Sequence, residues 1–173
     1  EYFKDTQHVT AEKFKEIFIA HRGYETYASN EKRPDGKLKS NTKAISNKIQ
    51  LDDYLKHLTT GRGLTLSPFL TDNNVGWGTL DIDKYTLTDE ELKNIIIRCR
   101  TLGLIACKTK SGGVHLYAFA SEDIPAKLMR QRLKFCRDEL KLDPKTEIFP
   151  KQDIKNGIGN GITIPYRGLF SKE

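Results

Sequence analysis

Cysteine is scarce in this chain of 173 residues, which has only Cys99, Cys107 and Cys136, and none of them forms a Cys-x-x-Cys pair. A zinc site is therefore not expected. Cys99 and Cys136 fall on apolar stripes with helical spacing, so we interpret them as reduced core residues of a cytosolic protein.

Long apolar runs are also missing. No segment approaches the roughly 20 apolar residues that a helix needs to span a bilayer, and no signal-peptide pattern opens the sequence. We therefore expect no membrane partner and a cytoplasmic protein. The first residue is Glu1 rather than Met, so we expect a fragment of a longer protein.

Basic residues outnumber acidic residues only modestly in this sequence. The formal net charge is +6, with 37% hydrophobic and 30% charged residues, which fits a globular protein with one core. Basic residues concentrate in an aperiodic stretch, residues 29–50, which predicts a long loop or a β-ribbon. They are Arg33, Lys37, Lys39, Lys43 and Lys48. From charge alone, binding to a nucleic-acid backbone and a solvated flexible loop are equally good interpretations.

Apolar periodicity and turn signals predict an α+β fold with an open mixed sheet. The expected helices lie near residues 10–21, 51–58, 88–102 and 125–140. Thr10 is the expected N-cap of the first helix, and Thr88 with Glu91 forms a capping box for the third. The expected strands are residues 63–70, 75–83, 104–109, 114–120, 146–149 and 161–165. We expect the first two strands to form a hairpin, and the third helix to complete a β-α-β unit.

The most informative motif is the acidic end of the apolar run 75–83. In a strand, residues two apart project from the same face, so Asp81 and Asp83 would point together while Ile82 points into the core. Two neighbouring carboxylates on a buried strand repel each other unless a cation neutralises them. Hard divalent cations such as Mg²⁺ and Mn²⁺ prefer such oxygen ligands. We favour a metal site over the simpler interpretation, a strand that ends in an Asp-rich turn.

A second candidate site is the segment 108–115. Gly112 and Gly113 allow a tight bend whose backbone N–H groups could bind an anion, and Ser111 and His115 flank it as hydrogen-bond donors. Taken alone, Ser-Gly-Gly is more typical of an ordinary hairpin turn. The β-α-β connection, however, brings the strand before this bend into the same sheet as the acidic pair, which favours a phosphate site beside a cation site.

The third candidate is the short strand 146–149. Glu147 could supply a third carboxylate to the metal site, and Lys151 and Gln152 could reach a phosphate or a base. The alternative is an edge strand ended by Pro150, with Glu147 solvated. From spacing alone, the two interpretations are equally good.

These three motifs, in this order and spacing, resemble those of the archaeo-eukaryotic primase superfamily, most closely the primase-polymerases of phages, plasmids and CRISPR-linked mobile elements. They are Asp81-Ile-Asp83, Ser111-Gly-Gly-Val-His115, and Glu147 to Gln152 followed by residues 159–165. The resemblance runs from about Tyr24 to Pro165. It implies a single catalytic domain, with a palm resembling an RNA-recognition motif in residues 61–173 after a small helical and basic-loop element in residues 1–60.

The resemblance implies nucleotidyl transfer by a DNA primase or DNA polymerase that uses two Mg²⁺ or Mn²⁺ ions. Asp81, Asp83 and Glu147 would bind these ions, although many relatives carry the third acid at the position of Thr146. His115 would be the fourth residue of the catalytic group.

The resemblance also implies a set of binding residues and partners. Ser111, His115 and the backbone of Gly112 and Gly113 would hold the triphosphate of a dNTP or NTP. Lys151 and Gln152 match the family pattern. A single-stranded or primed DNA template would follow the basic residues Arg33, Lys37, Lys39 and Lys43. The expected setting is a prokaryotic cell, phage or mobile element, with a helicase or priming domain elsewhere in the full-length protein.

Three other interpretations remain open. A metal-dependent nuclease or a replication initiator could use a similar sheet, but an initiator needs two histidines separated by one residue, and the four histidines do not provide such a pair. A non-catalytic module that binds nucleic acid or nucleotide would have lost its metal-dependent chemistry. In a structural or adaptor domain, the paired Asp residues would merely end a strand.

Overall fold

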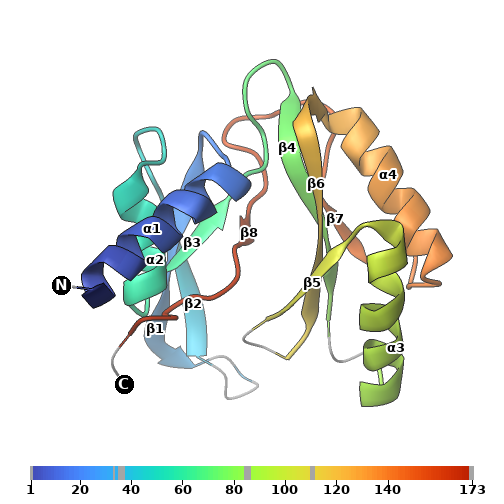
Figure 1. Cartoon of the computed structure of the whole chain (residues 1–173), viewed down its shortest axis with the longest axis horizontal. Coiled ribbons are helices and arrows are strands. Elements are labelled where there is room, and N and C mark those ends of the chain that lie inside the picture. The colour runs from blue at the N-terminus through green and yellow to red at the C-terminus, as the bar shows by residue number, and fades with distance from the viewer. Residues whose placement is uncertain (1, 33, 35–37, 84–86, 110–111, 172–173) are drawn as a thin grey trace. The chain divides into compact units, whose positions relative to one another are not determined.

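The computed structural model describes the chain except for residues 1, 33, 35–37, 84–86, 110–111 and 172–173. It divides into two compact units (Figure 1). Unit 1 comprises residues 1–67 and 161–173, and unit 2 comprises residues 68–160. Each unit has helices and a four-stranded sheet, and all described strand pairs are antiparallel. The predicted α+β class is therefore confirmed.

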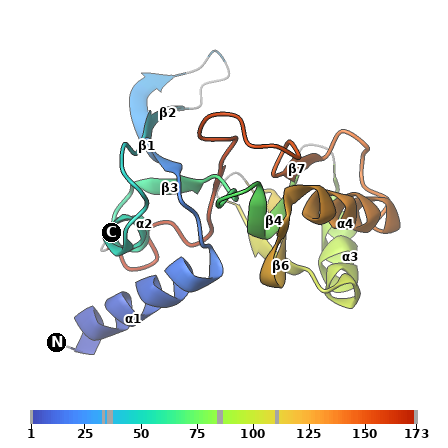
Figure 2. The same cartoon turned by 90° about the horizontal axis from the view of Figure 1, so that it is seen from above.

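Unit 1 is built on a sheet with the strand order β2-β1-β3-β8. Its strands are β1 (Gly23–Lys32), β2 (Leu38–Ala44), β3 (Gly63–Leu66) and β8 (Ile162–Thr163). Its helices are α1 (Tyr2–Ile17) and α2 (Leu51–Thr59). Of the two structures predicted for the basic stretch, a long loop or a β-ribbon, the ribbon is found. β1 and β2 pair along most of their length, while β3 pairs only with the first residues of β1 (Figure 2).

The first helix begins earlier than predicted. Thr10 is not an N-cap but lies in the middle of α1, where its hydroxyl donates to the carbonyl of Thr6 at 2.7 Å. A threonine can bond either to an N–H group ahead of it or to a carbonyl one turn behind it, and only the second option is compatible with a helix interior.

A buried histidine links three segments of unit 1. The side chain of His57, in α2, is only 1% exposed. Its Nδ1 accepts from the N–H of Leu64 at 3.0 Å, and its Nε2–H donates to the carbonyl of Pro165 at 2.7 Å. Both ring nitrogens are therefore used by the neutral imidazole. Burial, with a smaller effect of the Arg167 charge, lowers the pKa of His57 to about 4 despite the bond to Pro165.

This histidine predicts a loss of stability in mild acid. Between pH 6.5 and 4 the unfolded chain takes up a proton at His57 that the folded chain refuses, so the free energy of unfolding falls as the pH falls. From pH 7 to pH 5 the contribution is about 2 kcal/mol. Urea unfolding at the two pH values should show that His57→Gln weakens this dependence. The exposed His8 is the control, and an equal effect of His8→Gln would contradict the prediction.

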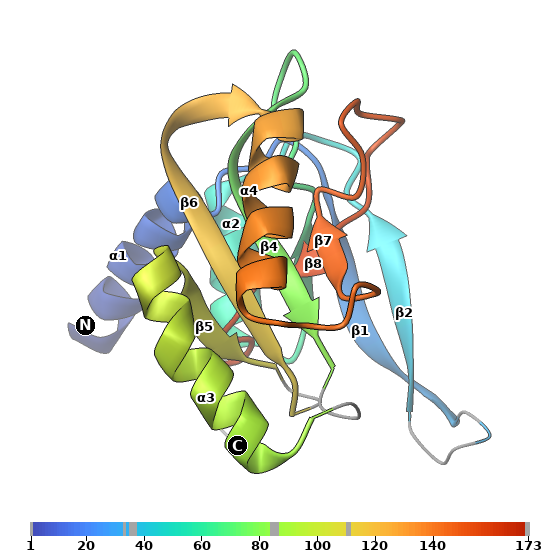
Figure 3. The same ribbon diagram turned by 90° about the vertical axis from the view of Figure 1, so that its right-hand side faces the viewer.

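Unit 2 is built on a sheet with the strand order β5-β6-β4-β7. Its strands are β4 (Asn74–Ile82), β5 (Ile105–Lys108), β6 (Val114–Pro125) and β7 (Glu147–Phe149). Its helices are α3 (Asp89–Cys99), which a 3-10 turn extends over Arg100–Leu102, and α4 (Ala126–Glu139). Both helices lie on the same side of the sheet (Figure 3).

The core of unit 2 fills the space between this sheet and its helices. Leu80 of β4, Leu116 of β6 and Ile148 of β7 pack in one buried cluster with Ile95 of α3 and Leu133 of α4. Because strand side chains alternate between faces, the neighbours of these residues project from the face that α3 and α4 do not cover.

Local signals predicted the helices of unit 2 well. Thr88 Oγ1 accepts from the N–H of Glu91 at 3.2 Å, and the Glu91 carboxylate accepts from the N–H of Thr88 at 2.8 Å, so the capping box is confirmed. Gly103 ends this segment with a left-handed φ of 70°. The interpretation of Cys99 and Cys136 as core residues is also confirmed, since both are buried and free and burial raises the pKa of both thiols.

Gly78 marks the closest approach of α4 to β4. A Cβ at this position would lie 2.7 Å from Met129 Cγ, 2.7 Å from the carbonyl oxygen of Phe149 and 2.9 Å from Leu133 Cδ1. The missing side chain is therefore required by packing between helix and sheet, not by the geometry of a turn.

The predicted hairpin between residues 63–70 and 75–83 is wrong. β3 ends at Leu66 and pairs with β1 and β8 in unit 1, whereas β4 lies in the sheet of unit 2. Only an isolated bridge between Phe69 and Val75 joins the two predicted strands. Both edges of β3 are occupied by other strands, so neither is available to β4.

The expected β-α-β connection is present in a modified form. β4 and β5 are both antiparallel to β6, which lies between them, so the helix α3 connects two parallel strands across an intervening one. The strand before the glycine bend therefore shares a sheet with the acidic strand, as predicted. No helix in the described part of the chain is long and apolar enough to cross a membrane.

Candidate functional site

Three of the predicted site residues form one row across the sheet of unit 2. Asp81 of β4 is paired directly with His115 of β6 on one side and with Glu147 of β7 on the other. Directly paired residues in antiparallel strands project from the same face, with Cβ atoms about 4.5–5.5 Å apart. This is the face opposite α3 and α4, because Leu80 and Ile148 point into the core between the sheet and those helices.

His115 lies between the carboxylate of Asp81 and the buried phenol of Tyr117. His115 Nε2 lies 3.3 Å from Asp81 Oδ1, and its Nδ1 lies 3.0 Å from the hydroxyl of Tyr117. The carboxylate can only accept, so it favours a proton on Nε2, and Nδ1 then accepts from the Tyr117 hydroxyl. Burial raises the pKa of Tyr117, which keeps the phenol protonated as this arrangement requires. The imidazole is thus oriented from both sides.

Glu147 is balanced by a cation from the residues after β7. Lys151 Nζ lies 2.7 Å from Glu147 Oε1 and 5.0 Å from the centre of the Phe149 ring. Two like charges directly opposite each other on adjacent strands destabilise a sheet. Here the ammonium group of Lys151 faces Glu147 and the Nε2–H of His115 faces Asp81, which reduces the repulsion between the two carboxylates.

Asp83 lies just beyond the strand that carries Asp81. β4 ends at Ile82, and Asp83 is the next residue and is exposed. Strand alternation therefore determines the direction of Asp81 but does not extend to Asp83. Within the described residues, no three His, Cys, Asp or Glu side chains form a ready-made metal cluster.

The glycine bend joins β5 to β6 in a tight hairpin. The N–H of Thr109 donates to the carbonyl of Gly113 at 2.9 Å, and Gly112 has a left-handed φ of 89°. A Cβ on Gly113 would lie 2.4 Å from the carbonyl oxygen of Ile82. The bend therefore approaches the end of β4 closely, next to Asp83. Ser111 lies outside the described residues, so its predicted contact with phosphate stays a prediction.

The remaining predicted residues occupy separate places. Gln152 follows Lys151 in the loop after β7 and is half-buried. Lys39 and Lys43 are exposed on β2 in unit 1, and Lys39 Nζ pairs with Glu31 at 2.8 Å. The other two predicted basic residues, Arg33 and Lys37, lie outside the described residues.

Sequence reasoning missed two members of this face. Tyr117 follows His115 by two residues on β6, so strand alternation could have identified it. Cys107 of β5 is paired with His115 and extends the row by one strand. No local signal identifies Cys107, because its place depends on the register between β5 and β6.

Comparison with known proteins identifies the family of the chain. No curated protein matches the sequence. A family model described as the archaeo-eukaryotic primase domain of the TOTE conflict system matches residues 1–172, which is nearly the whole chain. The suspected relationship to primases, first drawn from three short motifs, is thereby confirmed, and the chain belongs to the family of archaeo-eukaryotic primase domains found in TOTE conflict systems.

Proposed function

We propose that the chain catalyses template-directed nucleotidyl transfer, as a DNA primase or DNA polymerase that uses nucleoside triphosphates. Membership of a primase family supports a nucleotidyltransferase in general terms. The observation that carries the finer proposal is the row of Glu147, Asp81 and His115 on the face of one sheet opposite α3 and α4, close to a glycine hairpin.

The donor set on this face has the chemistry that a divalent cation requires. Asp81 and Glu147 are adjacent carboxylates on one face, and Asp83 follows at the end of the same strand. These three residues would hold two Mg²⁺ or Mn²⁺ ions, with oxygen ligands of the kind both ions prefer. Bound ions would supply charge stabilisation for the attacking and leaving oxygens of the transfer.

The residues of the chain would position the substrate around this centre. His115 is held in one orientation by Tyr117, so its Nε2–H is available to Asp81 or to a phosphate oxygen that replaces it. The backbone of Gly112 and Gly113 would cradle the triphosphate beside the end of β4. Phosphoryl transfer depends mainly on such positioning and electrostatic stabilisation, which explains why few side chains are needed.

Extension of a 5′-labelled primer on a DNA template tests the proposal. We expect incorporation of dNTP or NTP with Mg²⁺ or Mn²⁺ and none in the presence of EDTA. A folded protein that binds nucleotide only with a metal ion but never extends a primer would instead be a non-catalytic binding module. A folded protein that binds no nucleotide, with or without a metal ion, would overturn the proposal altogether.

The contact between Lys151 and Glu147 gives a separate prediction for metal binding. The ammonium group would compete with a cation for the same carboxylate oxygen, so Lys151→Met should raise the affinity for Mn²⁺. An exposed ion pair is worth a few tenths to 1 kcal/mol, which corresponds to about a 2- to 5-fold effect. Calorimetric titration of Mn²⁺ without nucleotide measures it. The matched control is Lys134→Met on the exposed side of α4. Unchanged or weaker binding by the Lys151 variant would contradict the prediction.

A further inference from the structure

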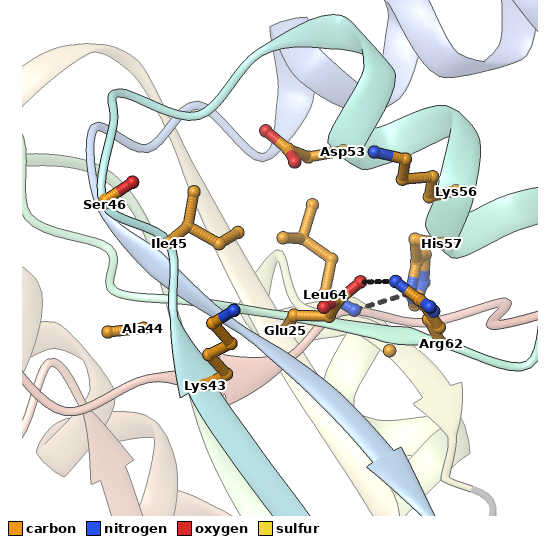
Figure 4. Close-up of a pocket in the computed structure, with 11 residues that line it drawn as sticks. Glu25, Lys43, Ala44, Ile45, Ser46, Asp53, Lys56, His57, Arg62 and Leu64 are labelled. Carbon is orange, nitrogen blue, oxygen red and sulfur yellow. Dashed lines mark hydrogen bonds and ion pairs between the residues drawn. The ribbon is translucent and has the colours of Figure 1, made fainter.

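A polar cavity lies in unit 1, and none of the residues assigned a role in unit 2 lines it. Its volume is about 240 Å³, several times the space that one water molecule takes. Residues of β1, β2, α2 and the start of β3 line it, together with the two residues after β2 (Figure 4). The charged residues of the lining are Glu25, Lys43, Asp53, Lys56 and Arg62.

The two carboxylates of the cavity are both engaged by neighbouring groups. Glu25 Oε1 pairs with Arg62 Nη1 at 2.8 Å, and Asp53 Oδ2 accepts from the N–H of Gln50 at 2.8 Å at the start of α2. His57, which also lines the cavity, adds no charge at neutral pH, because burial lowers its pKa to about 4. Of the cations in the lining, Lys56 is also engaged, since its Nζ pairs with Asp52 at 2.7 Å.

Lys43 differs from the other two cations of the lining, Lys56 and Arg62, which each pair with a carboxylate. It is paired across β1 and β2 with Glu25, yet the Glu25 carboxylate turns to Arg62 instead. Figure 4 shows the Lys43 side chain extending toward the cavity. Within the described residues, Lys43 forms no ion pair. Lys39 lies four residues earlier on the same face of β2, about 13 Å away at the usual rise of a strand. Lys39, which pairs with Glu31, and Lys43 therefore lie in line on one face of the ribbon.

We propose that this cavity binds a phosphate group of a nucleic-acid strand, with Lys43 and Arg62 as its ligands and Glu25 as a competing internal anion. Glu25 pairs with Arg62 in the structure, and an incoming phosphate takes over part of that contact. A strand passing along β2 would place a second phosphate near Lys39. The inference rests on the proposed function only for the identity of the strand as template, because the binding itself needs no chemistry in unit 2.

Anisotropy of a fluorescein-labelled dT12 oligonucleotide, without metal or nucleotide, tests the proposal. We expect Lys43→Gln and Arg62→Gln to weaken binding about 3- to 10-fold and to reduce the slope of log K against log salt by about 0.7 each. Glu25→Gln should do the opposite and tighten binding about 2- to 5-fold, since it removes the competing charge. A merely structural role for the Glu25–Arg62 pair would not tighten binding. Thermal melting of each variant checks that unit 1 stays folded.

Three controls make the outcome decisive. Lys13→Gln removes the same charge from an exposed position of α1 that does not line the cavity, and it should change affinity less than 2-fold. If it is as harmful as Lys43→Gln, only the net charge matters and the proposal fails. If dTMP competes as well as unlabelled dT12, the occupant is a mononucleotide and the strand is ruled out. Asp123→Asn removes an exposed carboxylate of unit 2 outside the proposed site and should leave binding of dT12 unchanged. Because the binding assay contains neither metal nor nucleotide, failure of the cavity and failure of the proposed catalysis can be told apart.

Discussion

Asp81→Asn is expected to lower nucleotide incorporation by about 10³-fold or more, the largest effect on activity of any single change at this site. Asp81 occupies the centre of the row, with His115 and Glu147 directly opposite it on the two neighbouring strands. Asparagine keeps the shape of the side chain but removes the negative charge that would hold a divalent cation. The primer-extension assay with Mg²⁺ or Mn²⁺ measures the loss.

The same substitution should leave the fold intact. Asp81 lies opposite another carboxylate, so removal of its charge relieves repulsion and should not lower the melting temperature. Asp123→Asn at the other end of β6 is a matched control, because it removes one exposed carboxylate from the same unit. An Asp81→Asn protein that extends primers at the parental rate would remove Asp81 from the catalytic residues and leave it a strand-ending residue.

Gly78→Ala is expected to destabilise the protein by about 3 kcal/mol, near the upper end of the usual cost of overpacking a core. The new Cβ would meet Met129, Leu133 and the backbone of Phe149, all within 3 Å. Flexible Met129 can move away, but the Phe149 carbonyl belongs to β7 and cannot move without disturbing its pairing with β4.

Gly61 provides the matched control for this change. A Cβ on Gly61 would meet nothing within 4 Å, so Gly61→Ala should change the free energy of unfolding by less than about 0.5 kcal/mol. Urea denaturation of both variants gives the comparison. Equal stabilities would show that α4 shifts away from β4 at little cost.

The sequence predicted those elements whose signals are local. The capping box at Thr88 acts within one turn of the chain, and it is found in the structure. The prediction for Thr10 was wrong because its hydroxyl can bond either to an N–H group ahead of it or to a carbonyl one turn behind it. The sequence alone does not decide between these two bonds. The hairpin was wrong for a different reason, since strand pairing is decided by residues far away in the sequence.

The candidate site also combines features that have local sequence signals with features that depend on distant residues. Asp81, His115 and Glu147 were each proposed from their own motifs, but the row that they form depends on the register of β4 with two other strands. A shift by one residue would have turned His115 to the helix-covered face. For the cavity of unit 1, the sequence predicted a binding role for Lys43 but not for Lys56 of α2 or Arg62 just before β3, because only the fold brings the three together.

The path of the chain through the two units has a consequence for the order in which they form. Unit 1 needs residues 161–173, which include β8 and the carbonyl of Pro165 that His57 contacts. During synthesis on the ribosome, all residues of unit 2 therefore emerge before unit 1 has its last strand. Unit 2 can therefore fold first. Until residues 161–173 are made, one edge of β3 is unpaired and one ring nitrogen of His57 lacks its hydrogen-bond partner.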